Sequence, residues 1–315
     1  MIATLLTQLV LPLGLMSWLA FRSAGSALEF VLQVASTGLA LFALSRVSLW
    51  MFLPFWLPYL YAVIFAAAVV KRLRPSGFRF ATLLPHTVRA WAVTTVFLLL
   101  GIFSAYLTAE AALGRQLPDA EIADISMPLD RGIFVVAHGG SKELINAHLM
   151  TLDPSVPRFK AYRGQYYALD LFEINRLGFR ANGLQPRDPE QYKIFGQPVL
   201  APCEGTVVVR RDDRPDMPVP EMDLDTIEGN HVLLDCEDFE LLLAHFQQGT
   251  VTVTAGDKVS VGDELGLVGN SGKTTEPHLH ISAQKASTNA QRFSGEPMAI
   301  TIEGEFYVRN DRLKN

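Results

Sequence analysis

The 315-residue sequence predicts an N-terminal α-helical transmembrane region followed by a mainly antiparallel β domain, and a chain of this length has room for about two domains. Charge is divided unevenly, because residues 1–109 contain seven of the 27 Lys and Arg residues but one of the 32 Asp and Glu residues, Glu29. The same part holds four long apolar stretches, whereas short segments rich in β-branched residues follow it. These observations exclude a single soluble globular domain.

The apolar stretches are long enough to cross a bilayer, because about 20 helical residues span roughly 30 Å of hydrocarbon. Only the second contains a charged side chain, Glu29, together with Gln33. The stretches are Ile2–Ala20, Ala27–Leu44, Met51–Val70 and Ala90–Ala109. A buried core helix explains one such stretch, but four in succession without amphipathic spacing favour membrane spans. We therefore expect residues 1–109 to lie in a lipid bilayer.

The distribution of basic residues predicts the orientation. The connection between the third and fourth spans carries Lys71, Arg72, Arg74, Arg79 and Arg89. Because basic loops stay on the cytoplasmic side, the N-terminus and everything after Ala109 are expected to face outward. A cleavable signal peptide is disfavoured, since the first stretch lacks a basic start and more spans follow it. The outward part has 20 basic and 31 acidic side chains, which argues against a nucleic-acid partner.

Residues 110–131, with Pro118 and Pro128, are expected to form a linker, and residues 132–315 a β-rich domain. Its predicted strands are short, rich in β-branched residues and bounded by Gly, Pro and Asp. They are Gly132–Ala137, Gly205–Arg211, His231–Cys236, Phe239–Phe246 and the strictly alternating Gly249–Thr254. Two residues separate the third and fourth of these, which indicates a hairpin.

Cys203 and Cys236 both fall in the outward part, each at the end of a predicted strand. An oxidising compartment permits a disulfide between them. Sequence alone does not bring their Cα atoms within reach, so two separate buried thiols remain the alternative.

Four residues carry side chains suited to metal chemistry. His278 and His280 alternate in a predicted strand, so both imidazoles project from one face. His245 interrupts the apolar strand that ends Leu-Ala-His-Phe, and Asp170 interrupts another in Tyr-Ala-Leu-Asp. A buried carboxylate requires a cation beside it. Taken singly, His278 and His280 are also compatible with surface histidines, and His245 with a core histidine.

In this order, several segments resemble the lysostaphin/LytM-type zinc metallopeptidases, which cut peptide bonds in bacterial cell-wall peptidoglycan. The resemblance covers roughly residues 132–300. The segments that carry it are Phe195–Val207, Gly229–Leu234, Leu243–Phe246, Gly256–Gly272 and Pro277–His280. It implies a compact, LytM-like, mainly antiparallel β fold with a groove, and Zn²⁺ as cofactor.

The resemblance also implies roles for single residues. Asp170 and His280 correspond to zinc ligands, and His245 and His278 to the histidines that act on the scissile peptide. The family's first ligand, a His four residues before the Asp, is Tyr166 in this chain. Asn146-Ala-His148 precedes Asp170 and resembles an N-x-H element of a subgroup, so His148 is the expected third ligand. The remaining alternatives are His138, a Tyr166 phenolate and no zinc, while His86 and His231 are interpreted as structural.

The resemblance implies a zinc metalloendopeptidase that hydrolyses peptidoglycan stem peptides by metal-activated water, and the predicted spans anchor it in the bacterial inner membrane. One alternative is a non-catalytic LytM-like module that binds or activates other cell-wall hydrolases. Another is a membrane sensor or transport component, in which Glu29 and Gln33 form a polar pair on one helix face. Retention of Asp170, His245, His278 and His280 favours the enzyme.

Overall fold

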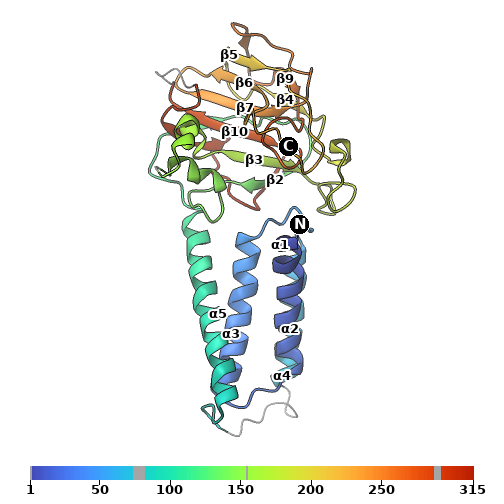
Figure 1. The fold of residues 1–315 in the computed structure, drawn as a ribbon, viewed down its shortest axis with the longest axis vertical. Coiled ribbons are helices and arrows are strands. Elements are labelled where there is room, and N and C mark those ends of the chain that lie inside the picture. Colours follow the sequence, from blue (N-terminus) through green and yellow to red (C-terminus); the bar gives the residue numbers. More distant parts are fainter. Residues whose placement is uncertain (1, 74–81, 154, 287–291) are drawn as a thin grey trace. The chain divides into compact units, whose positions relative to one another are not determined.

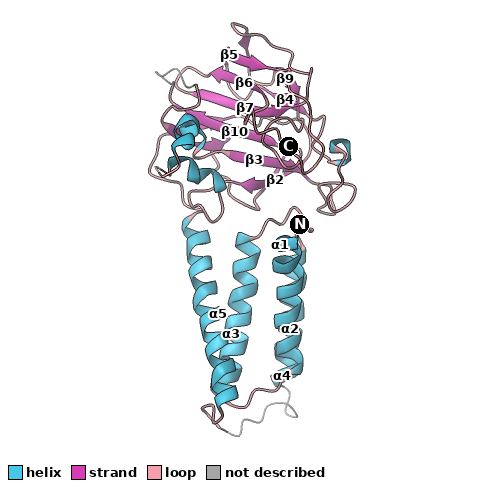
Figure 2. Cartoon of the chain, viewed as in Figure 1, coloured by secondary structure: helices cyan, strands magenta, loops and turns pink. Residues whose placement is uncertain are grey.

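The computed structural model describes residues 2–73, 82–153, 155–286 and 292–315. The chain divides into two compact units, Met1–Ala112 and Leu113–Asn315. The first is built of helices and the second mainly of strands (Figures 1 and 2). The predicted fold class, N-terminal apolar helices plus an antiparallel-sheet domain, is confirmed.

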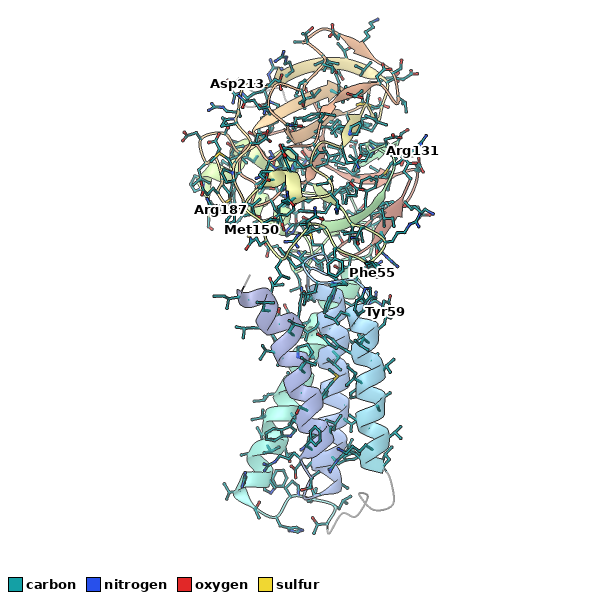
Figure 3. The ribbon with its side chains drawn as sticks, turned by 90° about the vertical axis from the view of Figure 1, so that its right-hand side faces the viewer. Phe55, Tyr59, Arg131, Met150, Arg187 and Asp213 are labelled. Carbon is teal, nitrogen blue, oxygen red and sulfur yellow. A yellow bond between two sulfur atoms is a disulfide. The ribbon has the colours of Figure 1, made fainter. Side chains whose placement is uncertain are left out.

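The helical unit begins with one continuous helix made of α1 (Ile2–Leu5), the π-helical turn η1 (Leu6–Val10) and α2 (Leu11–Phe21). The helices that follow are α3 (Ala27–Val47), α4 (Leu57–Leu73) and α5 (Val88–Leu113). Their outer surface is apolar, as at Tyr59, whose side chain is 69% exposed and projects outward from α4 (Figure 3).

Among the described residues, three helices are long and apolar enough to cross a membrane: Ile2–Phe21, Ala27–Val47 and Val88–Leu113. The predicted count of four spans is therefore not confirmed. The third predicted span, Met51–Val70, begins with turns, and its helix α4 has 17 residues. Pro54 disfavours an earlier helix start, since proline is tolerated in the first turn but not in the interior of a helix. Arg74 and Arg79 of the predicted basic loop lie outside the described residues.

A proline explains one polar contact inside the helical unit. Pro12 has no N–H, so it cannot donate to the Gln8 carbonyl four residues earlier. The Tyr61 hydroxyl donates to that carbonyl instead, at 2.6 Å. The Gln8 side-chain amide donates to the carbonyl of Leu49 at 2.9 Å. In apolar surroundings such bonds satisfy polar groups that water does not reach, so they join the helices.

Glu29 is buried at the start of α3, where it takes part in a helix cap. The Ser26 hydroxyl accepts from the Glu29 N–H at 3.2 Å, as an N-cap residue does. The Glu29 carboxylate accepts from the Gly25 N–H at 2.8 Å and from the Gln33 amide at 3.1 Å. These contacts give the pair Glu29 and Gln33 a structural role at this helix end.

The described part of the second unit forms a ten-stranded sheet with the order β12-β2-β3-β10-β7-β6-β5-β8, and β11 joins β1 to β10. Its pairings are antiparallel except for β1 with β11, which is parallel. The strands are β1 (Ile122–Ile125), β2 (Ile133–His138), β3 (Leu169–Glu173), β5 (Gly205–Arg211), β6 (Asn230–Asp235), β7 (Glu240–Phe246), β8 (Lys258–Val259), β10 (Leu279–Gln284), β11 (Pro297–Ile302) and β12 (Arg312–Lys314).

Shorter elements complete the unit. A two-stranded sheet pairs β4 (Pro198–Leu200) with β9 (Glu264–Leu267). The 3₁₀ turns are η2 (Ala147–Leu152), η3 (Pro157–Gln165) and η4 (Pro189–Gln191). The residues predicted as a linker, 110–131, contain the end of α5 and strand β1.

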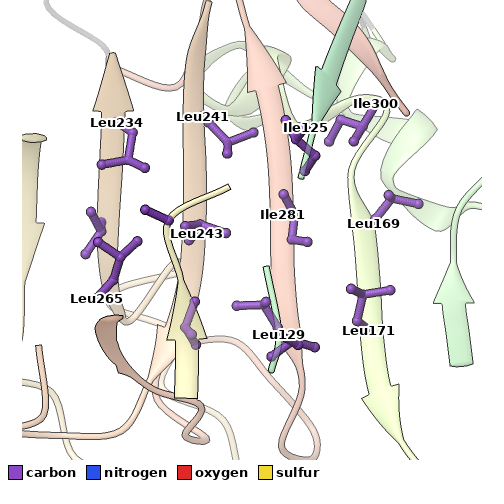
Figure 4. Packing of buried hydrophobic residues seen from close by; sticks show 14 of the residues in the cluster. Ile125, Leu129, Leu169, Leu171, Leu234, Leu241, Leu243, Leu265, Ile281 and Ile300 are labelled. Atoms are coloured by element: carbon purple, nitrogen blue, oxygen red, sulfur yellow. The ribbon is translucent and has the colours of Figure 1, made fainter. Parts of the chain in front are cut away.

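One face of the large sheet carries the apolar core. Leu171 of β3, Leu243 of β7 and Ile281 of β10 project into it from neighbouring strands (Figure 4). Since side chains alternate along a strand, the intervening residues of these strands face the opposite side. That side carries Asp170 and His280, so alternation separates the polar site from the apolar core.

The predicted hairpin is confirmed, because β6 and β7 pair in antiparallel register around Glu237 and Asp238. The strand predicted at Gly249–Thr254 is wrong, because these residues lie outside every strand. Their alternation places Val251 and Val253 against the core. The backbone there makes isolated hydrogen bonds instead of a continuous β-ladder. One of them runs from the Thr252 N–H to the Leu265 carbonyl at 3.0 Å.

Cys203 and Cys236 form a disulfide, with their Cα atoms 5.9 Å apart. This contact decides the alternative that the sequence left open. Cys203 precedes β5 and Cys236 follows β6, so the bond closes a loop between residues 33 apart in the sequence.

Candidate metal centre

The strand register brings the candidate residues into one row. Asp170 on β3 pairs with His280 on the neighbouring β10. On the other side of β3, Asp170 pairs with His138 of β2, and His280 pairs with Ala244 of β7. Side chains at paired positions lie close together. Four strands that are far apart in the sequence therefore deliver their polar residues to one place.

His245 reaches this place because β7 contains a bulge. His231 of β6 pairs with Ala244 and Asn230 with Phe246, so His245 is an extra residue between the two pairs. Its φ is 70°, in the left-handed region that side chains other than glycine rarely adopt. The bulge lets Phe246 enter the apolar core while His245 joins the opposite face. In a regular strand, strict alternation would direct His245 into the core.

Three of the predicted residues offer converging ligand atoms. The His280 Nδ1 lies 2.9 Å from Asp170 Oδ1, and the His148 Nε2 lies 3.5 Å from Asp170 Oδ2. One ligand atom from each of the three residues lies within 4.8 Å of the other two. Donors around tetrahedral zinc at about 2.1 Å are roughly 3.4 Å apart. The spacing therefore suits a single small cation.

The surroundings of Asp170 also fit a cation. Its side chain is 8% exposed, and in the described part of the chain the basic groups within 4 Å of its carboxylate are the imidazoles of His148, His278 and His280. Burial alone would raise the pKa of Asp170, but the surrounding imidazoles hold that pKa well below its usual range. Burial lowers the pKa of His148 to about 3, so its ring is neutral and keeps a lone pair. Two imidazoles and a carboxylate are typical zinc ligands.

His278 lies beside this group with a fixed ring. Its Nδ1 contacts the Glu276 carbonyl at 2.9 Å and the Thr274 hydroxyl at 3.0 Å. The ring stacks on Phe172, with centroids 5.0 Å apart, and its Nε2 lies 3.5 Å from Asp170 Oδ1. Burial opposes a charge on His278, but the nearby Asp170 carboxylate more than offsets it, so the pKa of His278 is raised.

His245 is held in a similar way but differs in its charge. Its Nδ1 contacts the Ser271 carbonyl at 2.8 Å, which requires the proton on Nδ1 and leaves Nε2 with a lone pair. The ring centroid lies 4.7 Å from that of His278 and 5.8 Å from that of His280. Burial, followed by the neighbouring His278, lowers the pKa of His245 well below its ordinary value. His245 is therefore a neutral acceptor beside the three ligand atoms.

The two alternative third ligands, His138 and Tyr166, make other contacts. His138 Nδ1 accepts from the Arg309 guanidinium at 3.2 Å and from the Ala147 N–H at 3.3 Å, and its ring centroid is 5.6 Å from that of His148. Tyr166 directly follows η3, and its ring packs edge-on against Tyr167, with centroids 4.6 Å apart. Within the described residues, His148 is the imidazole that joins Asp170 and His280.

Of the two histidines interpreted as structural, His231 is buried and His86 is exposed. The His231 Nδ1 lies 2.9 Å from the Gly229 carbonyl, and its ring packs edge-on against Phe293. His86 belongs to the helical unit, on the segment before α5.

Sequence reasoning missed the side chains that support the site. Arg180 and Glu276 form a buried ion pair at 2.8 Å, and the Glu276 carbonyl contacts His278. The Gln165 amide donates to the buried Glu228 carboxylate at 3.0 Å, and the Glu228 carbonyl accepts from the His245 N–H at 3.2 Å. Glu276 stands two residues before His278, which was the available signal. Arg180 and Glu228 lie in loops, where the sequence has no periodic pattern that would indicate their role.

Part of the C-terminal unit is similar to known proteins. Residues 191–292 match the model of peptidase family M23. Endolysin 2638A of Staphylococcus phage 2638A is 32% identical over 94 residues, which cover 28% of this chain and 19% of the endolysin. The chain thus spans about a fifth of the length of that curated relative. Residues 191–292 of the C-terminal unit are thus similar to peptidase family M23.

Solved structures give weaker likenesses. The catalytic domain of lysostaphin from Staphylococcus simulans is 22% identical with a TM-score of 0.26, over 39% of this chain and 69% of that domain. A zinc-containing peptidase from Vibrio cholerae is 20% identical with a TM-score of 0.24, over 37% of this chain and 26% of that peptidase. A putative peptidase M23 from Pseudomonas aeruginosa is 17% identical with a TM-score of 0.27, over 65% of this chain and 60% of that protein. The M23 match includes His245, His278 and His280, whereas His148 and Asp170 precede it.

Proposed function

We propose that this chain is a membrane-anchored zinc metalloendopeptidase that hydrolyses peptide bonds in the stem peptides of peptidoglycan. The observation that carries the proposal is the convergence of His148, Asp170 and His280 beside two further imidazoles, His245 and His278. The match to peptidase family M23 supports both the reaction class and the wall substrate.

His148 Nε2, one oxygen of Asp170 and His280 Nδ1 would hold the zinc ion. Three protein ligands leave a fourth position open, as in catalytic rather than structural zinc sites. When bound, zinc lowers the pKa of a coordinated water toward neutrality and polarises the scissile carbonyl. Asp170 supplies the negative charge that balances part of the charge of the ion. Its low pKa keeps this carboxylate ionised at neutral pH.

His245 and His278 would carry the protons. Both rings direct Nδ1 to a backbone carbonyl, at Ser271 and Glu276 respectively, so both keep Nε2 for the reaction. One of the two takes a proton from the attacking water, and the other stabilises the oxyanion or protonates the leaving amine. A site that only bound a metal would not need this second pair of imidazoles, so the pair favours the enzyme.

The location is part of the proposal. We place the chain in the bacterial inner membrane as a multi-pass protein with its C-terminal unit facing the periplasm or the cell exterior. Basic residues after α4 support a cytoplasmic loop there. The Cys203–Cys236 disulfide supports an oxidising compartment for the other unit. A periplasmic reporter fused after Asn315 should be active, and a silent fusion would contradict this orientation.

The test uses the full chain in detergent, with metal analysis and digestion of purified peptidoglycan followed by mass spectrometry. We expect about one zinc per chain and release of stem-peptide fragments. His280→Ala should lose both zinc and hydrolysis, whereas His278→Ala should keep zinc and lose about 10²–10⁴-fold in rate. His86→Ala, an exposed histidine of the helical unit, is the matched control and should change neither.

Two outcomes would overturn the proposal. Wild-type chain that binds no zinc at neutral pH would remove the metal centre. Wild-type chain that binds zinc but leaves peptidoglycan intact would favour the non-catalytic module, whose partners are other cell-wall hydrolases.

A further inference from the structure

Asn146 lies next to the metal centre and is completely buried, at 0% exposure. It caps the 3₁₀ turn η2, where its Oδ1 accepts from the His148 N–H at 3.1 Å. The same Oδ1 lies 3.0 Å from the His148 Nδ1. Its Nδ2 donates to the carbonyls of Gly140 and Ala168, each at 3.1 Å. Every hydrogen-bonding position of this amide is thus occupied.

Backbone groups decide which way the amide points. The carbonyls of Gly140 and Ala168 can only accept, so they require the NH₂ end. The backbone N–H of His148 can only donate, so it requires the oxygen end. A flipped amide would put donor against donor and acceptor against acceptor. The oxygen of Asn146 therefore faces the ring of His148.

This orientation determines the tautomer of His148. An oxygen that only accepts, at 3.0 Å from Nδ1, requires the proton on Nδ1. The lone pair of the neutral ring is then on Nε2, the atom that lies 3.5 Å from Asp170 Oδ2. A ring with the other tautomer would present a proton, not a lone pair, to the metal position.

We infer that Asn146 is a positioning residue that holds His148 as an Nε2 ligand, by fixing its tautomer and its ring orientation. The inference rests on the proposed function for the identity of the metal. Removing a residue that hydrogen-bonds to a metal ligand typically weakens metal binding 10–100-fold. Asn146 also donates to Ala168, two residues before Asp170, so it ties the 3₁₀ turn to the strand of a second ligand.

The affinity test is a double-mutant cycle on the full chain in detergent, with zinc affinity measured by competition with a chromophoric chelator. Asn146→Ser should weaken zinc binding 10–100-fold in the wild-type background and cause little further loss in the His148→Ala background. Equal losses in both backgrounds would mean that Asn146 does not act through His148, and would overturn the inference. The control is Asn175→Ser, because Asn175 also accepts from two backbone N–H groups but contacts no imidazole.

A second variant separates tautomer control from packing. Asn146→Asp keeps an oxygen toward His148 but loses both donated bonds and buries a charge. We expect it to be the less stable of the two variants and yet to bind zinc more tightly than Asn146→Ser. The reverse order of affinity would assign Asn146 a merely structural role.

A third measurement needs no metal and so separates this inference from the proposed function. Nitrogen-15 NMR of histidine-labelled, metal-free chain should show His148 protonated on Nδ1, and Asn146→Ser should shift it toward the Nε2-protonated form. Nε2-protonated His148 in the wild type would overturn the inference even if the chain hydrolyses peptidoglycan. Nδ1-protonated His148 in a chain without hydrolase activity would support the inference and contradict the proposed function.

Discussion

Replacing His245 with glycine should leave the C-terminal unit more stable than replacing it with alanine. Both substitutions remove the imidazole and its contact with the Ser271 carbonyl, so hydrolysis should be lost in both. They differ in how well each residue tolerates the bulge, where φ is 70°. Glycine adopts this conformation freely, whereas a Cβ makes it unfavourable.

The magnitude follows from the backbone. The left-handed conformation costs a residue with a side chain about 1–2 kcal/mol. Glycine loses about 0.5–1 kcal/mol more conformational entropy on folding than alanine does. The difference favours His245→Gly over His245→Ala by about 0.5–1 kcal/mol. At the preceding Ala244, outside the left-handed region and buried, Ala244→Gly should instead destabilise by at least that amount.

The assay is pulse proteolysis of the full chain in urea, following the C-terminal unit on a gel. Tryptophan fluorescence would not report on this unit, because Trp18, Trp50, Trp56 and Trp91 all belong to the helical unit. With a urea dependence of about 2 kcal/mol per M, the two His245 variants should differ in midpoint by roughly 0.3–0.5 M. If His245→Ala is as stable as His245→Gly, or more so, the strained bulge does not place His245 in the site, and this account of the site is wrong.

Reduction of the Cys203–Cys236 disulfide, or its replacement by two alanines, should destabilise the C-terminal unit by about 3–4 kcal/mol, because the bond closes a loop between residues 33 apart; an unchanged urea midpoint would contradict this. Acid should destabilise the metal-free chain, because burial lowers the pKa of His138 from 6.5 to about 4 and the folded state then binds fewer protons than the unfolded state. This stability is present above pH 6.5 and is lost as the pH falls to 4, so His138→Asn should flatten the profile measured by pulse proteolysis. Removing zinc with a chelator should lower the melting temperature of the wild type but not that of Asp170→Asn, as calorimetry would show.

Much of the architecture was predictable because it depends on local patterns. The apolar run of Ala90–Ala109 lies within α5, and the two-residue gap after Cys236 predicts the β6–β7 hairpin. Hydropathy did not predict where α4 begins, because proline positions as well as apolar residues determine it. Alternation did not distinguish Gly249–Thr254 from a strand, since valines that pack on the core produce the same period without a partner strand.

The candidate site divides in the same way. The alternation of His278 and His280, and the isolated carboxylate of Asp170, indicate a metal site because spacing along one strand determines which side chains share a face. By itself, the sequence therefore determined which residue types are available and on which strands they stand. It did not determine whether Cys203 and Cys236 meet, which depends on two segments packing together.

Only the tertiary structure decided which groups converge. His148 joins Asp170 through a 3₁₀ turn that Asn146 ties to β3, and His245 joins through a one-residue bulge. Neither a turn's docking position nor a bulge leaves a periodic signal, because both depend on contacts between segments that are far apart in the sequence. Which side chains hold the imidazoles in place likewise depends on how the strands of the sheet pair.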